Sequence, residues 1–105
     1  MTDNFVKVAL KSDVSKDTIK AVEIAGKHIA ICQSGENYYA ISDICSHAKV
    51  ALHNGQIVGE EIECPKHGAR FDLKTGKAMC LPAVQPIATY PLEVRGDEIW
   101  IAVAE

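Results

Sequence analysis

The chain has 105 residues, of which 48% are hydrophobic and 24% are charged, and its formal net charge is −3. This length suits one hydrophobic core, and the composition is that of a globular protein rather than a disordered one. No Lys/Arg stripe, signal peptide or apolar run of ~20 residues is visible. We therefore expect neither a nucleic acid nor a membrane as a partner, and a cytoplasmic location.

Four short strands are expected before residue 43, at residues 5–10, 18–24, 28–33 and 38–41. In the first of them, Val6, Val8 and Leu10 occupy every second position, which is the pattern of a half-buried strand. Turn signals at residues 25–27 and 34–37 separate the later strands. These four strands are expected to form an antiparallel meander.

Two more strands are expected at residues 88–94 and 99–103, on either side of a hairpin loop at residues 95–98. Six short strands at roughly ten-residue spacing predict an all-β fold, an antiparallel β-sandwich or small barrel. The stretch from about 43 to 86 has little strand pattern beyond residues 60–63. We interpret it as a loop-rich, cofactor-binding insertion in a single domain that covers residues 1–105.

Two short motifs in this insertion each combine a cysteine with a histidine. Cys45-Ser46-His47 and Cys64-Pro65-Lys66-His67 are separated by sixteen residues. Two thiolates and two imidazoles suit a tetrahedral site for a soft metal, so zinc and an iron–sulfur cluster are the candidates. Zinc fingers of the Cys2His2 type usually group like ligands, whereas here each motif supplies one ligand of each type.

This mixed pairing resembles the Rieske family, in which two Cys bind one iron and two His bind the other. The resemblance includes the segments at residues 67–72 and 74–77, and Leu81-Pro82-Ala83 is similar to the family's proline-containing loop over the cluster. It implies a Rieske fold with a cluster-binding subdomain and one [2Fe–2S] cluster. By this match Cys45 and Cys64 bind the buried iron, while His47 and His67 bind the iron nearer solvent. A structural zinc site is the alternative.

Four neighbouring positions bear on the reduction potential. High-potential respiratory members of the family have two additional cysteines where this chain has Val50 and Lys66, and a Ser and a Tyr where it has Ala69 and Phe71. The resemblance thus implies that a loop disulfide and two hydroxyl donors are absent. Because such donors stabilise the reduced cluster, we expect a potential near the low end of the Rieske range, about −150 mV.

These features resemble the soluble ferredoxin component of bacterial aromatic-ring-hydroxylating dioxygenase systems. The resemblance implies a monomeric electron carrier without catalytic residues. It would take single electrons from an NAD(P)H-dependent flavoprotein ferredoxin reductase and deliver them to a terminal Rieske non-heme iron oxygenase. The oxygenase itself is not expected, because it needs a second domain. The alternatives are a small Rieske subunit of an oxidoreductase such as nitrite reductase, and a zinc-stabilised interaction domain.

Partner docking is expected around the exposed His pair, on a small surface formed by Ala48, Lys49, Val50, Lys66, Pro82 and Ala83. The acidic run at residues 60–63 is interpreted as a solvated strand face, with electrostatic orientation of a basic reductase as the alternative.

The remaining chemically distinctive residues are interpreted as structural. His28 and His53 are expected at the surface, and Cys32 as a small buried apolar side chain. Trp100 is expected to pack on its strand. Cys80 precedes the proline-containing loop, and no role is assigned to it.

Overall fold

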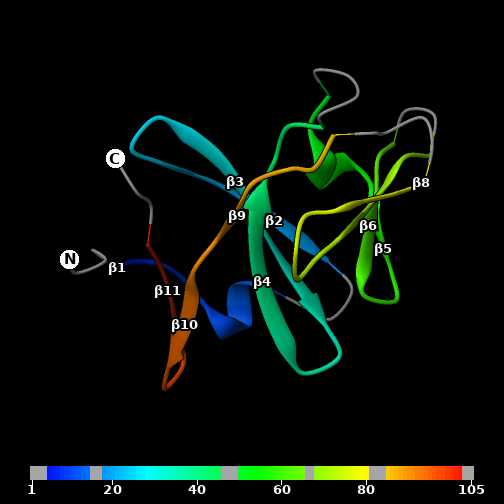
Figure 1. The fold of residues 1–105 in the computed structure, drawn as a ribbon. Helices are drawn as coiled ribbons and strands as arrows, with labels where there is room; N and C mark the ends of the chain where they lie inside the picture. Colours follow the sequence, from blue (N-terminus) through cyan, green and yellow to red (C-terminus); the bar gives the residue numbers. More distant parts are fainter. Residues whose placement is uncertain (1–4, 15–17, 46–49, 66–67, 81–84, 103–105) are drawn as a thin grey trace.

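The computed structural model describes residues 5–14, 18–45, 50–65, 68–80 and 85–102 (Figure 1). The strands in this part of the chain are β1 (Phe5–Leu10), β2 (Ile19–Ile24), β3 (Lys27–Ser34), β4 (Asn37–Ser42), β5 (Gln56–Val58), β6 (Glu61–Glu63), β7 (Arg70–Asp72), β8 (Ala78–Cys80), β9 (Thr89–Tyr90), β10 (Leu92–Arg95) and β11 (Glu98–Ala102). Two short 3-10 helices, η1 (Lys11–Asp13) and η2 (Leu52–Asn54), accompany them. No helix within these ranges is long and apolar enough to cross a bilayer.

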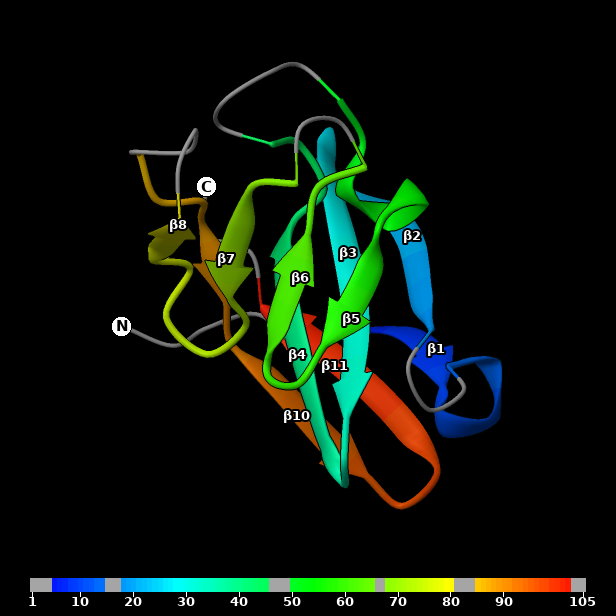
Figure 2. The ribbon, with the colours of Figure 1, turned by 90° about the vertical axis from the view of Figure 1, so that its right-hand side faces the viewer.

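The strands form three antiparallel sheets. We name them the terminal sheet (β1-β11-β10), the central sheet (β2-β3-β4-β9) and the insertion sheet (β5-β6-β7-β8). Figure 2 shows the insertion sheet in front of the central sheet, with the terminal sheet behind both. The architecture confirms the predicted all-β, antiparallel sandwich class.

The central sheet is covered on both faces, as β3 makes clear. Its residues Ile29, Ala30, Ile31 and Cys32 are all fully buried. Because successive side chains point to opposite faces, Ile29 and Ile31 pack towards the terminal sheet while Ala30 and Cys32 pack towards the insertion sheet. This two-sided burial explains why β3 contains a continuous apolar run rather than an alternating pattern.

Two-residue turns join several neighbouring strands. Between β2 and β3, Ala25 and Gly26 both have positive φ angles, of 51° and 79°. The other turns of this kind place a glycine first, at Gly35, Gly59 and Gly96. Such backbone matches the twist of antiparallel hairpins, and glycine adopts it without steric cost.

The predicted role of the first strand is partly wrong. The bounds of β1 agree with the prediction, but β1 pairs with β11 instead of joining the meander. The register shifts between Lys7 and Ala9, so Val8 is an extra residue that reverses the alternation. As a result Ala9 is buried, whereas Val6 and Leu10 are 42% and 39% exposed.

Two further expectations are refined or corrected. The insertion is loop-rich, as expected, but it also contains a four-stranded sheet, β5–β8, whose three-residue strands are too short to show an alternating pattern. The strand expected at residues 88–94 is two strands, β9 in the central sheet and β10 in the terminal sheet. Pro91 separates them, since proline has no N–H for a ladder hydrogen bond.

Candidate functional site

The two motif cysteines lie in one hydrophobic cluster between the central and insertion sheets. Cys45 lies three residues beyond the end of β4, and Cys64 directly follows β6. Both side chains are buried, among Leu52, Ile62 and Phe71. Segments from two different sheets therefore deliver two thiols to the same part of the core.

Each of these cysteines opens a loop that is closed in the same way. The backbone N–H of Cys45 donates to the carbonyl of Val50 (3.0 Å), and the N–H of Cys64 donates to the carbonyl of Ala69 (2.6 Å). Both hydrogen bonds link a cysteine to the residue five positions later. His47 and His67 occupy sequence positions within these two spans and lie outside the described residues.

The donor chemistry of the described residues fits an iron–sulfur cluster. Cys45 and Cys64 both carry thiols that are not in disulfides in this part of the chain. Buried thiols held by backbone hydrogen bonds are suitable ligands for a soft metal such as iron. The described residues contain no group of three His, Cys, Asp or Glu side chains that could hold a metal ion, and His47 and His67 are not among these residues.

The base of the Cys45 loop is held by Asp43 and His53. Asp43 is 4% exposed. Its carboxylate accepts a hydrogen bond from the backbone N–H of His53 (2.7 Å) and another from the ring Nδ1 of His53 (2.6 Å). The backbone of Asp43 is also bonded, to the carbonyl of His28 and to the N–H of Leu52.

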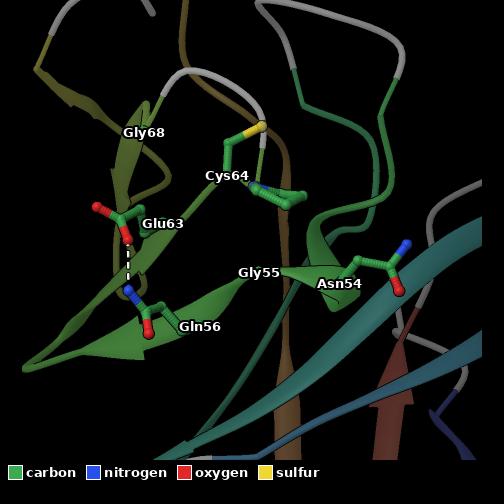
Figure 3. A pocket seen from close by; sticks show the side chains of 7 residues that line it. Asn54, Gly55, Gln56, Glu63, Cys64 and Gly68 are labelled. Atoms are coloured by element: carbon green, nitrogen blue, oxygen red, sulfur yellow. Dashed lines mark hydrogen bonds between the residues drawn. The ribbon is translucent and has the colours of Figure 1, made fainter.

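A second polar group lies beside Cys64, on the outer face of the insertion sheet. Glu63 accepts hydrogen bonds from Gln56 and from Arg70. Hydrogen bonding from Gln56, assisted by Arg70, lowers the pKa of the Glu63 carboxyl. A cavity of about 400 Å³ lies beside this group, lined by Asn54, Gly55, Gln56, Glu63, Cys64, Pro65 and Gly68. Figure 3 shows how Gln56, Glu63 and Cys64 lie relative to one another.

The structure places the remaining candidates as follows. Cys32 is fully buried, as predicted, and burial, with a contribution from the charge of Asp43, raises the pKa of its thiol to about 12. Ala69 and Phe71 are fully buried next to the second cysteine loop, and Val50 packs against the same cluster. Cys80 ends β8. The docking residues other than Val50, and Leu81-Pro82-Ala83, lie outside the described residues.

Expectations for His28, Trp100 and the acidic run at residues 60–63 concern parts of the chain away from the thiols. His28 is exposed, as predicted. Trp100 is only partly buried, and the guanidinium of Arg95 lies 4.4 Å from its ring centroid. In the acidic run, the fully buried Ile62 faces the core while the neighbouring glutamates are at least partly exposed.

Sequence reasoning missed the pairing of Asp43 with His53. The position of His53 near the surface was predicted correctly, since its side chain is 37% exposed. Its partner was not predicted, because ten residues separate the two. The available signal was an acidic residue directly after a strand and two positions before a candidate ligand, where a buried carboxylate needs a donor.

Comparisons with known proteins agree with the resemblance to the Rieske family. A family model described as the Rieske [2Fe-2S] domain matches residues 4–91. The ferredoxin component of the naphthalene 1,2-dioxygenase/salicylate 5-hydroxylase systems of Ralstonia sp is 35% identical over 101 residues, 96% of this chain and 97% of that protein.

Solved ferredoxin structures also resemble this chain. The ferredoxin of carbazole 1,9a-dioxygenase from Nocardioides aromaticivorans IC177 matches with a TM-score of 0.90 and 38% identity, over 94% of this chain and 97% of that chain. A chain in the complex of reduced oxygenase and oxidized ferredoxin in carbazole 1,9a-dioxygenase matches with a TM-score of 0.88 and 32% identity, over 96% and 94%. These matches confirm the resemblance inferred from the two Cys/His motifs.

Proposed function

Because the chain belongs to the Rieske [2Fe-2S] domain family, we propose that it is the electron-carrying ferredoxin of an aromatic-ring dioxygenase system. In this role it takes single electrons from an NAD(P)H-dependent flavoprotein reductase and delivers them to a terminal oxygenase, without catalytic residues of its own. The observation that carries the proposal is the pair of matching loops, each opened by a buried thiol, of Cys45 and of Cys64.

The proposed ligands of the cluster are Cys45, His47, Cys64 and His67. The burial of the two cysteines supports their assignment to the inner iron, and their sequence motifs support the two histidines. When bound, the cluster supplies one-electron redox chemistry. The protein fixes the two thiols by backbone hydrogen bonds and excludes water from them with Leu52, Ile62 and Phe71.

The terminal oxygenase is the better supported of the two partners. The carbazole dioxygenase complex contains a ferredoxin together with its oxygenase, and one of its chains superposes on this one over most of its length. A reductase partner, a monomeric state and a cytoplasmic location are further parts of the proposal that follow from the sequence. Light scattering and cell fractionation test the last two.

Spectroscopy on the aerobically purified protein tests the cofactor and its ligands. We expect a coloured protein that develops a Rieske-type EPR signal, with an average g near 1.9, after reduction with dithionite. Replacement of a histidine ligand, His47→Cys or His67→Cys, should change this spectrum, whereas the matched control His28→Cys should not. A colourless protein would support zinc instead and would refute the proposal.

Electron transfer is tested with the same material. The dithionite-reduced protein, freed of excess reductant, should reduce ferricytochrome c with a stoichiometry of one electron per protein. We also expect a midpoint potential near the low end of the Rieske range, about −150 mV. A midpoint above about +100 mV would contradict the low-potential assignment.

A further inference from the structure

The Asp43–His53 pair connects the central sheet to the loop that begins at Cys45. Asp43 directly follows β4, and its N–H donates to the carbonyl of His28 on β3 (2.9 Å). Beyond it, an isolated bridge pairs Ile44 with Ala51, and Cys45 is bonded to Val50. The Asp43–His53 pair is therefore the first of three successive cross-strand contacts, and the last of the three holds the backbone of Cys45.

Because the Asp43 carboxylate is buried, the Asp43–His53 contact is sensitive to the loss of one hydrogen-bond donor. The side chain of Asp43 is 6% exposed, and both hydrogen bonds that the described residues give to its carboxylate come from His53. A buried carboxylate is costly unless it is hydrogen-bonded, and bonds to a charged group are stronger than neutral ones. The imidazole of His53 supplies one of these two bonds from the protein surface.

Contacts through η2 also connect Asp43 to the segment that carries the second cysteine. The N–H of Leu52 donates to the carbonyl of Asp43 (2.6 Å), and the N–H of Gly55 donates to the carbonyl of Leu52 (2.9 Å). Gly55 in turn lies so close to Glu63 that a Cβ added to it would lie 1.9 Å from the Glu63 carbonyl oxygen. Glu63 immediately precedes Cys64, so η2 is packed between the segments that carry the two thiols.

We propose that His53 is a positioning residue for the cluster: by holding the carboxylate of Asp43, it fixes the base of the Cys45 loop and, through η2, the end of β6 that directly precedes Cys64. This inference rests on the proposed ligand role of the two cysteines. It assigns to a third histidine, which binds no iron, control over cluster retention and reduction potential.

Three variants of the holoprotein test the role of the ring donor. His53→Leu places a methyl carbon where Nδ1 lies and removes the donor, whereas His53→Asn places an amide nitrogen at the same position and keeps it. His28→Leu is the matched control, because it removes an exposed histidine from β3. The rate of bleaching of the visible spectrum in the presence of EDTA and the midpoint potential are measured for each.

We expect His53→Leu to lose its cluster roughly 10- to 100-fold faster than the wild type, the range that corresponds to one hydrogen bond to a charged group. Its midpoint potential should also fall, because a carboxylate with one donor fewer disfavours the more negative reduced cluster. His53→Asn and His28→Leu should remain within about twofold of the wild-type bleaching rate. An unchanged potential in His53→Leu, or equal effects of Leu and Asn, would overturn the proposal.

A double-mutant cycle separates this role from general destabilisation. If His53 acts through Asp43, then adding His53→Leu to Asp43→Asn should shift the potential much less than His53→Leu does alone. Full additivity would refute the coupling. If His53→Leu does not accumulate in folded form, Asp43→Asn is measured in its place, and a bleaching rate and potential unchanged from wild type in that variant would overturn the proposal. The Rieske signal of the wild type is recorded first, so that failure of the cluster assignment is distinguished from failure of this inference.

Discussion

The contact between Gly55 and the strand before Cys64 makes a quantitative prediction. A Cβ at residue 55 would lie 1.9 Å from the carbonyl oxygen of Glu63, whereas real Cβ contacts essentially never fall below 3.0 Å. The two segments must therefore separate by at least about 1.1 Å, the difference between these distances, to accommodate Gly55→Ala. The φ of Gly55 is −89°, outside the positive range that favours glycine, so the penalty is expected from the steric collision.

The colliding atom belongs to the backbone of β6, which cannot move without disturbing the insertion sheet. We therefore expect a cost near the upper end of the range for overpacking, about 3 kcal/mol. At roughly 4–8 °C per kcal/mol for a domain of this size, Gly55→Ala should lower the melting temperature by roughly 12–24 °C. The shift is measured on the holoprotein by circular dichroism, in the far ultraviolet and in the visible bands of the cluster.

Gly59→Ala is the matched control for this experiment. Gly59 has a positive φ of 62°, but a Cβ there would meet nothing within 4 Å. Its cost is therefore conformational and about 1 kcal/mol, or roughly 4–8 °C. If Gly55→Ala melts no lower than Gly59→Ala, η2 and β6 do not form the tight junction described above.

Three other predictions concern parts of the fold away from this junction. Ala25→Asn should stabilise the β2–β3 turn by about 0.5–1 kcal/mol, because asparagine tolerates positive φ better than alanine; a lower melting temperature would contradict this. With a pKa of about 12 in place of 9.0, Cys32 should react with iodoacetamide at pH 8 about a thousand times more slowly than an ordinary thiol, as peptide mapping would show. Hydrogen bonds from Trp100 and Lys7 lower the pKa of Glu98. The ionised Glu98 carboxylate therefore stabilises the fold at pH values above the unfolded-state pKa of about 4.3, and this stabilisation is lost as the pH falls through the lower folded-state pKa. Glu98→Gln should therefore be less stable than wild type in urea at pH 7, and the difference should shrink near pH 3.

The parts of the fold that were predictable are those governed by local chemistry. The hairpins from β2 to β4 could be located because turn residues such as Gly26 and Gly35 separate apolar strands, and both have positive φ. The two cysteine motifs could be located because their residue types and spacing are unusual. These signals extend over only a few residues, so they do not depend on the rest of the fold.

The parts that could not be predicted depend on contacts between distant segments. The insertion sheet is built from three-residue strands, and in β6 only Ile62 faces the core. The partner of β1 is β11, at the opposite end of the chain. The Asp43–His53 pair likewise forms only after η2 folds back onto the end of β4. The partners of β1 and of Asp43 therefore lie outside the short windows in which local patterns act, whereas the strands of the insertion sheet are neighbours in sequence but too short to show a pattern.

The placement of the thiols and the tuning of the cluster depend on different parts of the chain. Backbone hydrogen bonds hold the two cysteine loops, so substitutions at Ala69 and Phe71 should leave the loops closed. Both side chains are fully buried at the second loop and carry no hydroxyl group. Since hydrogen bonds to cluster sulfurs stabilise the reduced state, Ala69→Ser and Phe71→Tyr should each raise the midpoint potential within the Rieske range of about −150 to +300 mV, and the double variant should raise it further. Protein-film voltammetry measures the shift, with Leu73→Met as a control for a change in the same core. A double variant that keeps its EPR signal but has an unchanged potential would refute the idea that missing hydroxyl donors set the low potential.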